Sequence, residues 1–340
     1  MDEKVLLGHG SGGNMMRRII DEVFFAGYGN EDLAVGNDAA DLPAPQPGER
    51  IAYSSDSFVV TPHFFPGGDI GHLAVCGTVN DVATSGAVPK YLSSSFILEE
   101  GFPTEDLKRI VDSMRRVAQE AGVEIVTGDT KVVNRGHGDG VYINTSGVGF
   151  IPAGRQLGGQ YIQPGDRILV SGTLGDHGIT IMSCREELSF HADLQSDAAP
   201  LNHLIEEVLQ AAPETRCFRD PTRGGLASTL NELAEQSQVD MVVEEDAVPV
   251  KPAVRGACEM LGYDVLQVAN EGKMVAVVPA AQAEAALAAM GSNKYGADAA
   301  IIGEVVEADP RRGARVSIRT NFGSLRILDM LVGEQLPRIC

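Results

Sequence analysis

Apolar and polar positions along this chain alternate between helical and strand spacing. The clearest helical pattern runs from Thr104 to Gly122 and places its apolar residues on one face: Leu107, Ile110, Val111, Met114, Val117, Ala118 and Ala121. Thr104 is expected to cap the start of this helix and Gly122 to end it. A second helix is predicted over residues 70–83, with Asp69 as its N-cap.

Short apolar runs between helical patterns predict strands at residues 51–55, 123–127, 141–148, 167–170, 239–244 and 273–278. Further helices are expected at residues 226–236, 252–261 and 280–290. Glycine concentrates between residues 152 and 159, where we place a domain boundary. The pattern predicts an α+β fold with two domains, residues 1–153 and 154–332, followed by a flexible tail over residues 333–340.

Composition narrows the class of protein. A chain of 340 residues is long for one core, and a net charge of −20 argues against nucleic acid or an anionic membrane as a partner. The five cysteines contain no CxxC pair, so neither a zinc site nor a disulfide framework is indicated. No apolar run approaches the ~20 residues that span a bilayer. We therefore expect a cytoplasmic protein with reduced thiols.

A glycine-rich loop near the N-terminus is the first candidate for binding chemistry. Gly10, Ser11, Gly12 and Gly13 form part of a GxGxxG match that lacks the βαβ context of a dinucleotide fold. Such a loop can wrap phosphates through its backbone N–H groups, or it can be a flexible arm. The P-loop pattern GxxxxGK[ST] is absent, which excludes that type of nucleotide site.

Aspartates beside small or glycine-rich segments form a second set of candidates. Asp38, Asp56, Asp81, Asp129 and Asp220 all stand in such segments. Magnesium bound with nucleotide phosphates takes oxygen ligands from a few carboxylates and waters. Each aspartate alone is more often a cap or a turn residue than a metal ligand, so it is the combination with glycine-rich neighbours that favours a metal site.

Two further charged residues could take part in catalysis. Lys131 follows Asp129 and Thr130 at a predicted strand end, where its charge could meet a phosphate. Glu271 lies in a turn between apolar strands and could act as a general base. A second glycine-rich turn, residues 172–178, could bind phosphate or only close a tight turn.

The last residue, Cys340, is a thiol at the end of a tail. Chain ends are commonly exposed, and the thiolate is the nucleophilic form of cysteine. Residues 333–340 extend over up to ~25 Å, which would allow the thiol to carry a group between two active sites. The adjacent terminal carboxylate disfavours the thiolate, so we expect Cys340 not to be activated by its own chain.

Taken together these segments resemble the HypE family of hydrogenase maturation proteins. The matching stretches are residues 9–13, 56–60, 64–71, 77–81, 129–133, 175–178, 219–226, 268–272 and 337–340. The resemblance implies the two-domain, PurM-like fold of aminoimidazole ribonucleotide synthetase and selenophosphate synthetase. It also implies a homodimer formed by the N-terminal domains, with ATP near their interface.

The resemblance further implies a set of site residues. Asp38, Asp56, Asp81 and Asp220 would bind Mg²⁺. ATP would be held by the loop Gly10, Ser11, Gly12 and Gly13 and by the segment Asp129, Thr130 and Lys131. Catalysis would involve Cys340, Lys131 and Glu271.

The implied activity explains the terminal thiol. Cys340 would receive a carbamoyl group from the carbamoyltransferase HypF. ATP-dependent dehydration would convert that group to a thiocyanate, and cyanide would pass to iron held by the HypC–HypD complex.

Two other classes of function compete with this one. The first is another enzyme of the fold, such as selenophosphate synthetase or thiamine-phosphate kinase. Selenophosphate synthetase would be expected to carry a reactive cysteine near the N-terminus, whereas the first cysteine here is Cys76, inside a helix-like apolar pattern. A non-catalytic carrier would present Cys340 to partners without needing a magnesium–ATP site. The aspartate and glycine clusters favour the enzyme.

Overall fold

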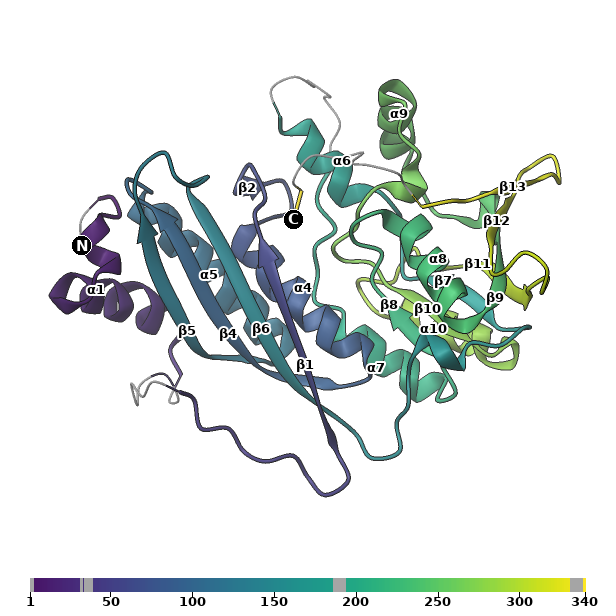
Figure 1. The fold of residues 1–340 in the computed structure, drawn as a ribbon, viewed down its shortest axis with the longest axis horizontal. Helices are drawn as coiled ribbons and strands as arrows, with labels where there is room; N and C mark the ends of the chain where they lie inside the picture. Colours follow the sequence, from purple (N-terminus) through teal and green to yellow (C-terminus); the bar gives the residue numbers. More distant parts are fainter. Residues whose placement is uncertain (1–2, 31–32, 34–38, 186–193, 331–338) are drawn as a thin grey trace.

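The N-terminal half is built on a four-stranded sheet of order β1-β6-β4-β5. The computed structural model describes residues 3–30, 33, 39–185, 194–330 and 339–340 (Figure 1). The strands of this half are β1 (Arg50–Phe58), β4 (Val88–Glu99), β5 (Glu124–Val133) and β6 (Val141–Ile151), with a small hairpin of β2 (Phe64–Phe65) and β3 (Gly68–Asp69). β6 runs antiparallel to both neighbours, whereas β4 and β5 are parallel.

Helices cover one face of this sheet. They are η1 (Leu7–Gly10), α1 (Gly13–Ile19), the π-helical η2 (Ile20–Phe25), α2 (Ala26–Tyr28), α4 (Ile70–Thr84) and α5 (Thr104–Ala121). The opposite face has no helical layer among the described residues (Figure 1). Ile51, Tyr53 and Ile97 are exposed on it. An apolar face of this kind is typical of an interaction surface.

Helix ends test the sequence predictions directly. Asp69 caps α4 as predicted, because its Oδ1 accepts hydrogen bonds from the N–H groups of Gly71 and His72 at 2.8 and 2.9 Å. The predicted cap at Thr104 is wrong by one residue. Pro103, with extended backbone, stands at the N-cap, and Thr104 is the buried first residue of the helix. Gly122 ends α5 with φ of +71°, as predicted.

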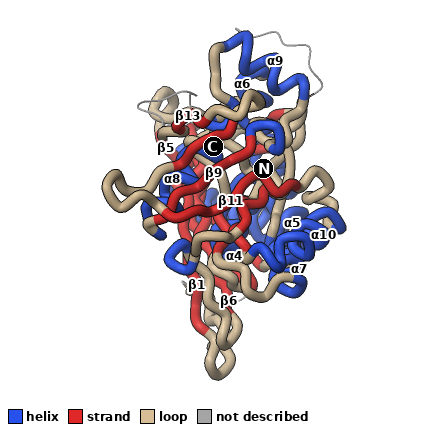
Figure 2. Tube along the Cα trace, turned by 90° about the vertical axis from the view of Figure 1, so that its right-hand side faces the viewer, coloured by secondary structure: helices blue, strands red, loops and turns tan. Residues whose placement is uncertain are grey.

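The C-terminal half contains a seven-stranded sheet of order β13-β12-β9-β11-β7-β10-β8. Figures 1 and 2 show its strands β9, β11 and β13 from two directions. Its strands are β7 (Arg167–Val170), β8 (Cys217–Arg219), β9 (Val239–Glu244), β10 (Val275–Val278), β11 (Ala300–Glu307), β12 (Val316–Arg319) and β13 (Leu325–Ile327). Its helices are η3 (Gly159–Tyr161), α6 (Asp176–Ser183), α7 (Asn202–Ala211), α8 (Gly225–Ser237), η4 (Glu245–Ala247), α9 (Pro252–Leu261), η5 (Val265–Gln267), η6 (Ala280–Gln282) and α10 (Ala283–Ser292). Two layered sheets with separate helices form an α+β fold.

The helix α4 joins the two halves. It is buried at most of its positions, because one side packs on the N-terminal sheet and another meets the C-terminal half. Asn80 fixes this contact: its Nδ2 donates to the Ala199 carbonyl at 3.0 Å, and its Oδ1 accepts from the Leu201 N–H at 2.7 Å. The chain ends beside this junction (Figure 1). No helix in the described residues is long and apolar enough to cross a membrane.

Candidate active site

A cavity of about 580 Å³ is lined by residues from both halves of the chain. Asp56 comes from the edge strand β1 and Asp81 from α4. Asp220 follows β8, Glu271 precedes β10, and Cys340 ends the chain. Tertiary structure thus brings together three predicted metal ligands and two predicted catalytic residues that lie far apart in sequence.

Three carboxyl groups of this cavity, those of Asp81, Asp220 and Glu271, have raised pKa values. Burial, followed by repulsion from Asp81, raises the pKa of Asp220 to about 6. Burial also raises the pKa of Asp81, although the Ser54 hydroxyl donates to it at 2.7 Å. Glu271 is 5% exposed with no hydrogen-bond partner at Oε1, and burial raises its pKa well above 4.5. A cation bound here would relieve this repulsion.

The donor set suits Mg²⁺, which binds carboxylate oxygens. Within the described part of the chain, no three acidic, histidine or cysteine side chains converge on one ion position. Asp38, the fourth predicted ligand, lies outside the described residues. Magnesium often takes one or two carboxylates and completes its shell with waters and phosphate oxygens. Asp56, Asp81 and Asp220 therefore remain predicted ligands for an ion that arrives with a nucleotide.

The thiol of Cys340 is held inside the cavity. Burial, and next the charge of Glu271, raise its pKa to about 12, while contact with Arg223 lowers it in part. The expectation of an unactivated thiol therefore agrees with the structure, but the main cause is burial and not the terminal carboxylate. Arg223 was not singled out by the sequence analysis. Its place in the matched segment 219–226, three residues after Asp220, was the available signal.

This burial predicts slow alkylation of Cys340. At neutral pH we expect iodoacetamide to modify Cys340 at least about tenfold more slowly than a free peptide of residues 336–340, because the thiolate is the reactive form. The ordinary thiol pKa is ~8.5, so the docked state is favoured most below that pH. Between ~8.5 and about 12 the undocked thiol is ionised while the docked thiol is still protonated, so docking becomes less favourable as the pH rises through this range. Mass spectrometry of the C-terminal peptide measures both rates. Equal rates at neutral pH would contradict the docking.

The glycine-rich loop lies against β5, in a separate part of the N-terminal half. A Cβ atom on Gly10 would stand 2.5 Å from the backbone nitrogen of Val132, so only glycine permits this approach. Gly12 and Gly13 adopt φ values of +82° and +71°, which favour glycine. The Ser11 hydroxyl donates to the backbone of the same loop at 2.9 Å. The loop is thus ordered against the strand that carries the predicted ATP-binding segment.

Asp129, Thr130 and Lys131 lie within β5 and not at a strand end, because β5 pairs with β4 as far as Val133. Lys131 Nζ is 2.7 Å from Asp129 Oδ2, and this ion pair holds the pKa of Asp129 below its usual value. β5 and β1 are the outer strands of the sheet. Three strand spacings, roughly 14 Å, therefore separate this segment from Asp56.

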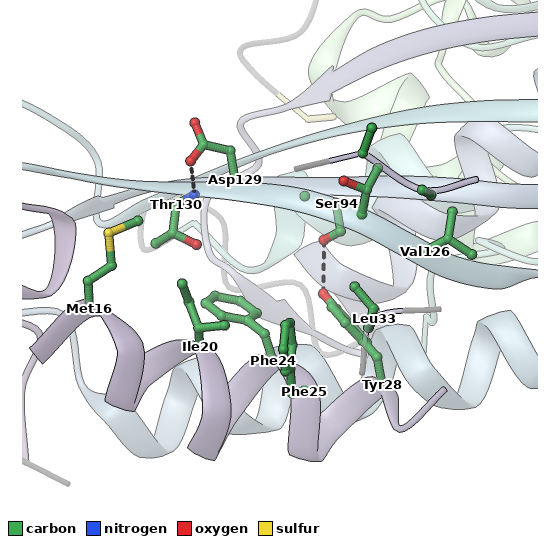
Figure 3. A pocket seen from close by; sticks show the side chains of 14 residues that line it. Met16, Ile20, Phe24, Phe25, Tyr28, Leu33, Ser94, Val126, Asp129 and Thr130 are labelled. Atoms are coloured by element: carbon green, nitrogen blue, oxygen red, sulfur yellow. Dashed lines mark hydrogen bonds between the residues drawn. The ribbon is translucent and has the colours of Figure 1, made fainter. Parts of the chain in front are cut away.

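Figure 3 shows a second cavity, of about 290 Å³, between the N-terminal helical segment and β5. Ile20, Phe24 and Tyr28 form an apolar wall opposite residues 126–130. The hydroxyl groups of Tyr28 and Ser94 share a hydrogen bond of 2.8 Å. The sequence analysis missed this cavity, although apolar residues four positions apart beside the glycine-rich loop were a signal. An apolar wall that faces polar groups of β5 suits a flat ring such as a nucleobase.

Comparison with known proteins follows the same two-part division. Models of AIR synthase related proteins match residues 36–151 with the N-terminal domain and residues 163–313 with the C-terminal domain. Carbamoyl dehydratase HypE of Cupriavidus necator is 55% identical over 337 residues, covering 99% of this chain and 95% of the relative.

Two solved structures are similar over most of their length. The hydrogenase maturation protein HypE in complex with ATP has a TM-score of 0.93 at 49% identity, and the match covers 98% of this chain and 99% of that one. A chain of the HypE–HypF complex has a TM-score of 0.80 at 49% identity, covering 92% and 99%. With such identity over nearly its whole length, the chain belongs to the carbamoyl dehydratase HypE family of AIR synthase related proteins.

Proposed function

We propose that this protein uses ATP to dehydrate an S-carbamoyl group carried on its own Cys340. The product is a thiocyanate that supplies cyanide for the iron of nickel–iron hydrogenase. The observation that carries the proposal is the position of the terminal thiol in the same cavity as Glu271 and three aspartates. Relatives named carbamoyl dehydratase HypE, and a HypE structure with ATP, support the class of reaction and the nucleotide.

The proposed reaction removes one water from Cys340–S–C(=O)–NH₂. The amide oxygen attacks the γ-phosphorus of ATP and ADP leaves, which turns a poor leaving group into a good one. The C–O bond then breaks with loss of phosphate, and the nitrogen gives up both protons as C≡N forms. The balance is Cys340–S–C(=O)–NH₂ + ATP → Cys340–S–C≡N + ADP + phosphate + H⁺, with phosphate written as the dianion.

Each candidate residue has a part in this scheme. Glu271 accepts a proton from the nitrogen, directly or through a water. Lys131, three strands away from Asp56, would offset charge on the phosphates of an ATP that lies across the sheet. Magnesium held by one or two of the carboxylates Asp56, Asp81 and Asp220 would supply further positive charge at the phosphates. Burial of Glu271 supports its role, since a raised pKa brings a carboxylate closer to the strength of a useful base.

We propose that this protein forms a homodimer through the sheet that carries the predicted ATP-binding residues of β5. The uncovered sheet face carries Ile51, Tyr53 and Ile97, and Ile97 is the partner of Lys131 in the β4–β5 register. We propose that a second copy covers this face and that ATP binds near the interface. The second cavity would receive the base, and residues 10–13 would close over the phosphates. The Asp129–Lys131 segment would then lie beside the neighbouring copy.

A disrupted interface tests this dimer. Ile97→Glu is expected to shift the light-scattering mass from a dimer to the 36.0 kDa monomer, because it places a charge on the face that would be buried. Met260→Glu is the matched control, since Met260 on α9 is equally apolar and 76% exposed. A monomeric wild type, or a dimer that survives Ile97→Glu, would contradict the proposed interface.

The partners follow from the same scheme. HypF would load the carbamoyl group, which a solved HypE–HypF complex supports. The HypC–HypD complex would receive cyanide on its iron. We place the reaction in the cytoplasm, where the thiol stays reduced.

Mass spectrometry of the C-terminal peptide tests the function. The protein is first carbamoylated on Cys340 by HypF and then incubated with or without ATP and magnesium. Loss of one water only in the presence of ATP is expected. Retention of the carbamoyl group with ATP would instead identify a carrier that only presents Cys340 to partners.

A further inference from the structure

The buried histidine of α6 contacts the end of the chain. His177 is 0% exposed, and its Nε2 lies 2.7 Å from the carbonyl oxygen of Ile339. Its Nδ1 lies 2.8 Å from the Ser196 hydroxyl, and its ring meets the Phe65 ring edge-on at 5.8 Å. The reaction scheme above uses none of these groups. The histidine nevertheless reaches the backbone directly before the reacting thiol.

One assignment of donors and acceptors satisfies all hydrogen bonds around this ring. A carbonyl oxygen only accepts, so Nε2 carries the proton and donates to Ile339. Burial lowers the pKa of His177, which keeps the ring neutral and makes Nδ1 an acceptor. The Ser196 hydroxyl accepts from the Ala198 N–H at 3.2 Å and donates to Nδ1. The C-terminal half thereby orients one donor toward the tail.

The side chain of Ile339 completes the contact. Ile339 is 5% exposed and belongs to the core cluster of the N-terminal half, which also includes Phe65, Ala198 and Ala269. Figure 1 shows the chain end close to β2 and α6. Apolar burial alone holds a side chain without direction. A hydrogen bond to the carbonyl adds a fixed register, because a shift by one residue moves the chain by ~3.4 Å and removes the acceptor.

We propose that His177 is a positioning residue, which holds the Ile339 carbonyl so that the sulfur of Cys340 enters the acidic cavity at the depth of Glu271. His177 acts through the tail backbone and does not touch the reacting atoms. This inference rests on the proposed dehydration of a group on Cys340. The alternative is that His177 is only a packed core residue, which the following variants separate from a positioning role.

Two substitutions isolate the hydrogen bond. His177→Phe keeps an aromatic ring beside Phe65 but removes the donor, whereas His177→Gln keeps an N–H at a similar distance. His203→Phe is the matched control, because His203 is an exposed histidine that bonds to the Glu120 carbonyl away from the cavity. Thermal unfolding is measured for each variant, so that loss of the fold is recognised.

The first readout is alkylation of Cys340 by iodoacetamide in the uncarbamoylated protein, without ATP. His177→Phe is expected to raise this rate at least about fivefold toward that of the free peptide. His177→Gln and His203→Phe should stay within about twofold of wild type. An unchanged rate in a folded His177→Phe protein overturns the proposal. If His177→Phe does not fold, Ser196→Ala takes its place, and an unchanged rate in Ser196→Ala then overturns the proposal.

The second readout is dehydration of the carbamoylated protein. His177→Phe should lower kcat at least about tenfold and leave KM for ATP within about twofold, since the tail and not the nucleotide is misplaced. Faster alkylation with normal dehydration would overturn the positioning role. If wild type itself loses no water with ATP, the proposed function fails. The alkylation rates would then still decide whether His177 holds the tail.

Discussion

Cys340→Ala is expected to abolish the proposed reaction completely while the fold stays intact. Alanine cannot accept a carbamoyl group, so no covalent substrate is formed. The thiol is only partly buried at the end of the chain, and its removal leaves the cores of both halves unchanged. The measurements are mass spectrometry of the C-terminal peptide after incubation with HypF and ATP, and the unfolding temperature. We expect no modified peptide and an unfolding temperature close to that of wild type.

Cys184→Ala is the matched control, since Cys184 is also a free cysteine of intermediate exposure but does not line the cavity. It should support carbamoylation and dehydration at rates within about twofold of wild type. Adding a few residues beyond Cys340 should block dehydration in the same way as Cys340→Ala, because the extension must fit into the cavity with the thiol. Thiocyanate formed on another cysteine of Cys340→Ala would contradict this assignment.

Glu271→Gln is expected to lower the dehydration rate by roughly 10²- to 10⁴-fold, the usual effect of losing a general base. Glutamine is nearly the same size, so the buried site should keep its shape, and carbamoylation of Cys340 should continue. Single-turnover kinetics on the carbamoylated protein measure the loss. Glu232→Gln is the control, because Glu232 lines the same cavity but is ion-paired with Arg219 at 2.7 Å.

The pH dependence of the dehydration rate should also report the role of Glu271. Glu271 accepts a proton only when it is ionised, so the rate should fall as the pH drops through its pKa. Burial, and next the charge of Asp220, raise that pKa above 4.5, so the acid limb should lie above pH 4.5. Bound magnesium would move it down again. Glu271→Gln should lack this limb. A normal rate in Glu271→Gln would remove Glu271 from the mechanism.

The local pattern predicted many elements because helix and strand periodicity reflect which faces are buried. The strand at 167–170, the strand at 239–244 and the helix at 252–261 agree with β7, β9 and α9. The central strand β4 was missed, since its polar serines hide the alternation of its buried positions. The predicted helix at 280–290 begins late: residues 280–282 form η6, and α10 runs from Ala283 to Ser292. Helix propensity alone does not distinguish a 3-10 turn from the first turn of an α-helix.

The sequence alone was sufficient to recognise the family. Stretches that include the glycine-rich loop, several aspartates and the terminal thiol resemble HypE proteins, and the comparisons confirm that family. Tertiary structure decided how these residues are grouped. It gathers Asp56, Glu271 and Cys340 around one cavity and leaves Lys131 on a distant strand. The physical reason is that residue type and spacing follow from the local chain, whereas burial and neighbouring charge depend on segments that meet only in the folded protein.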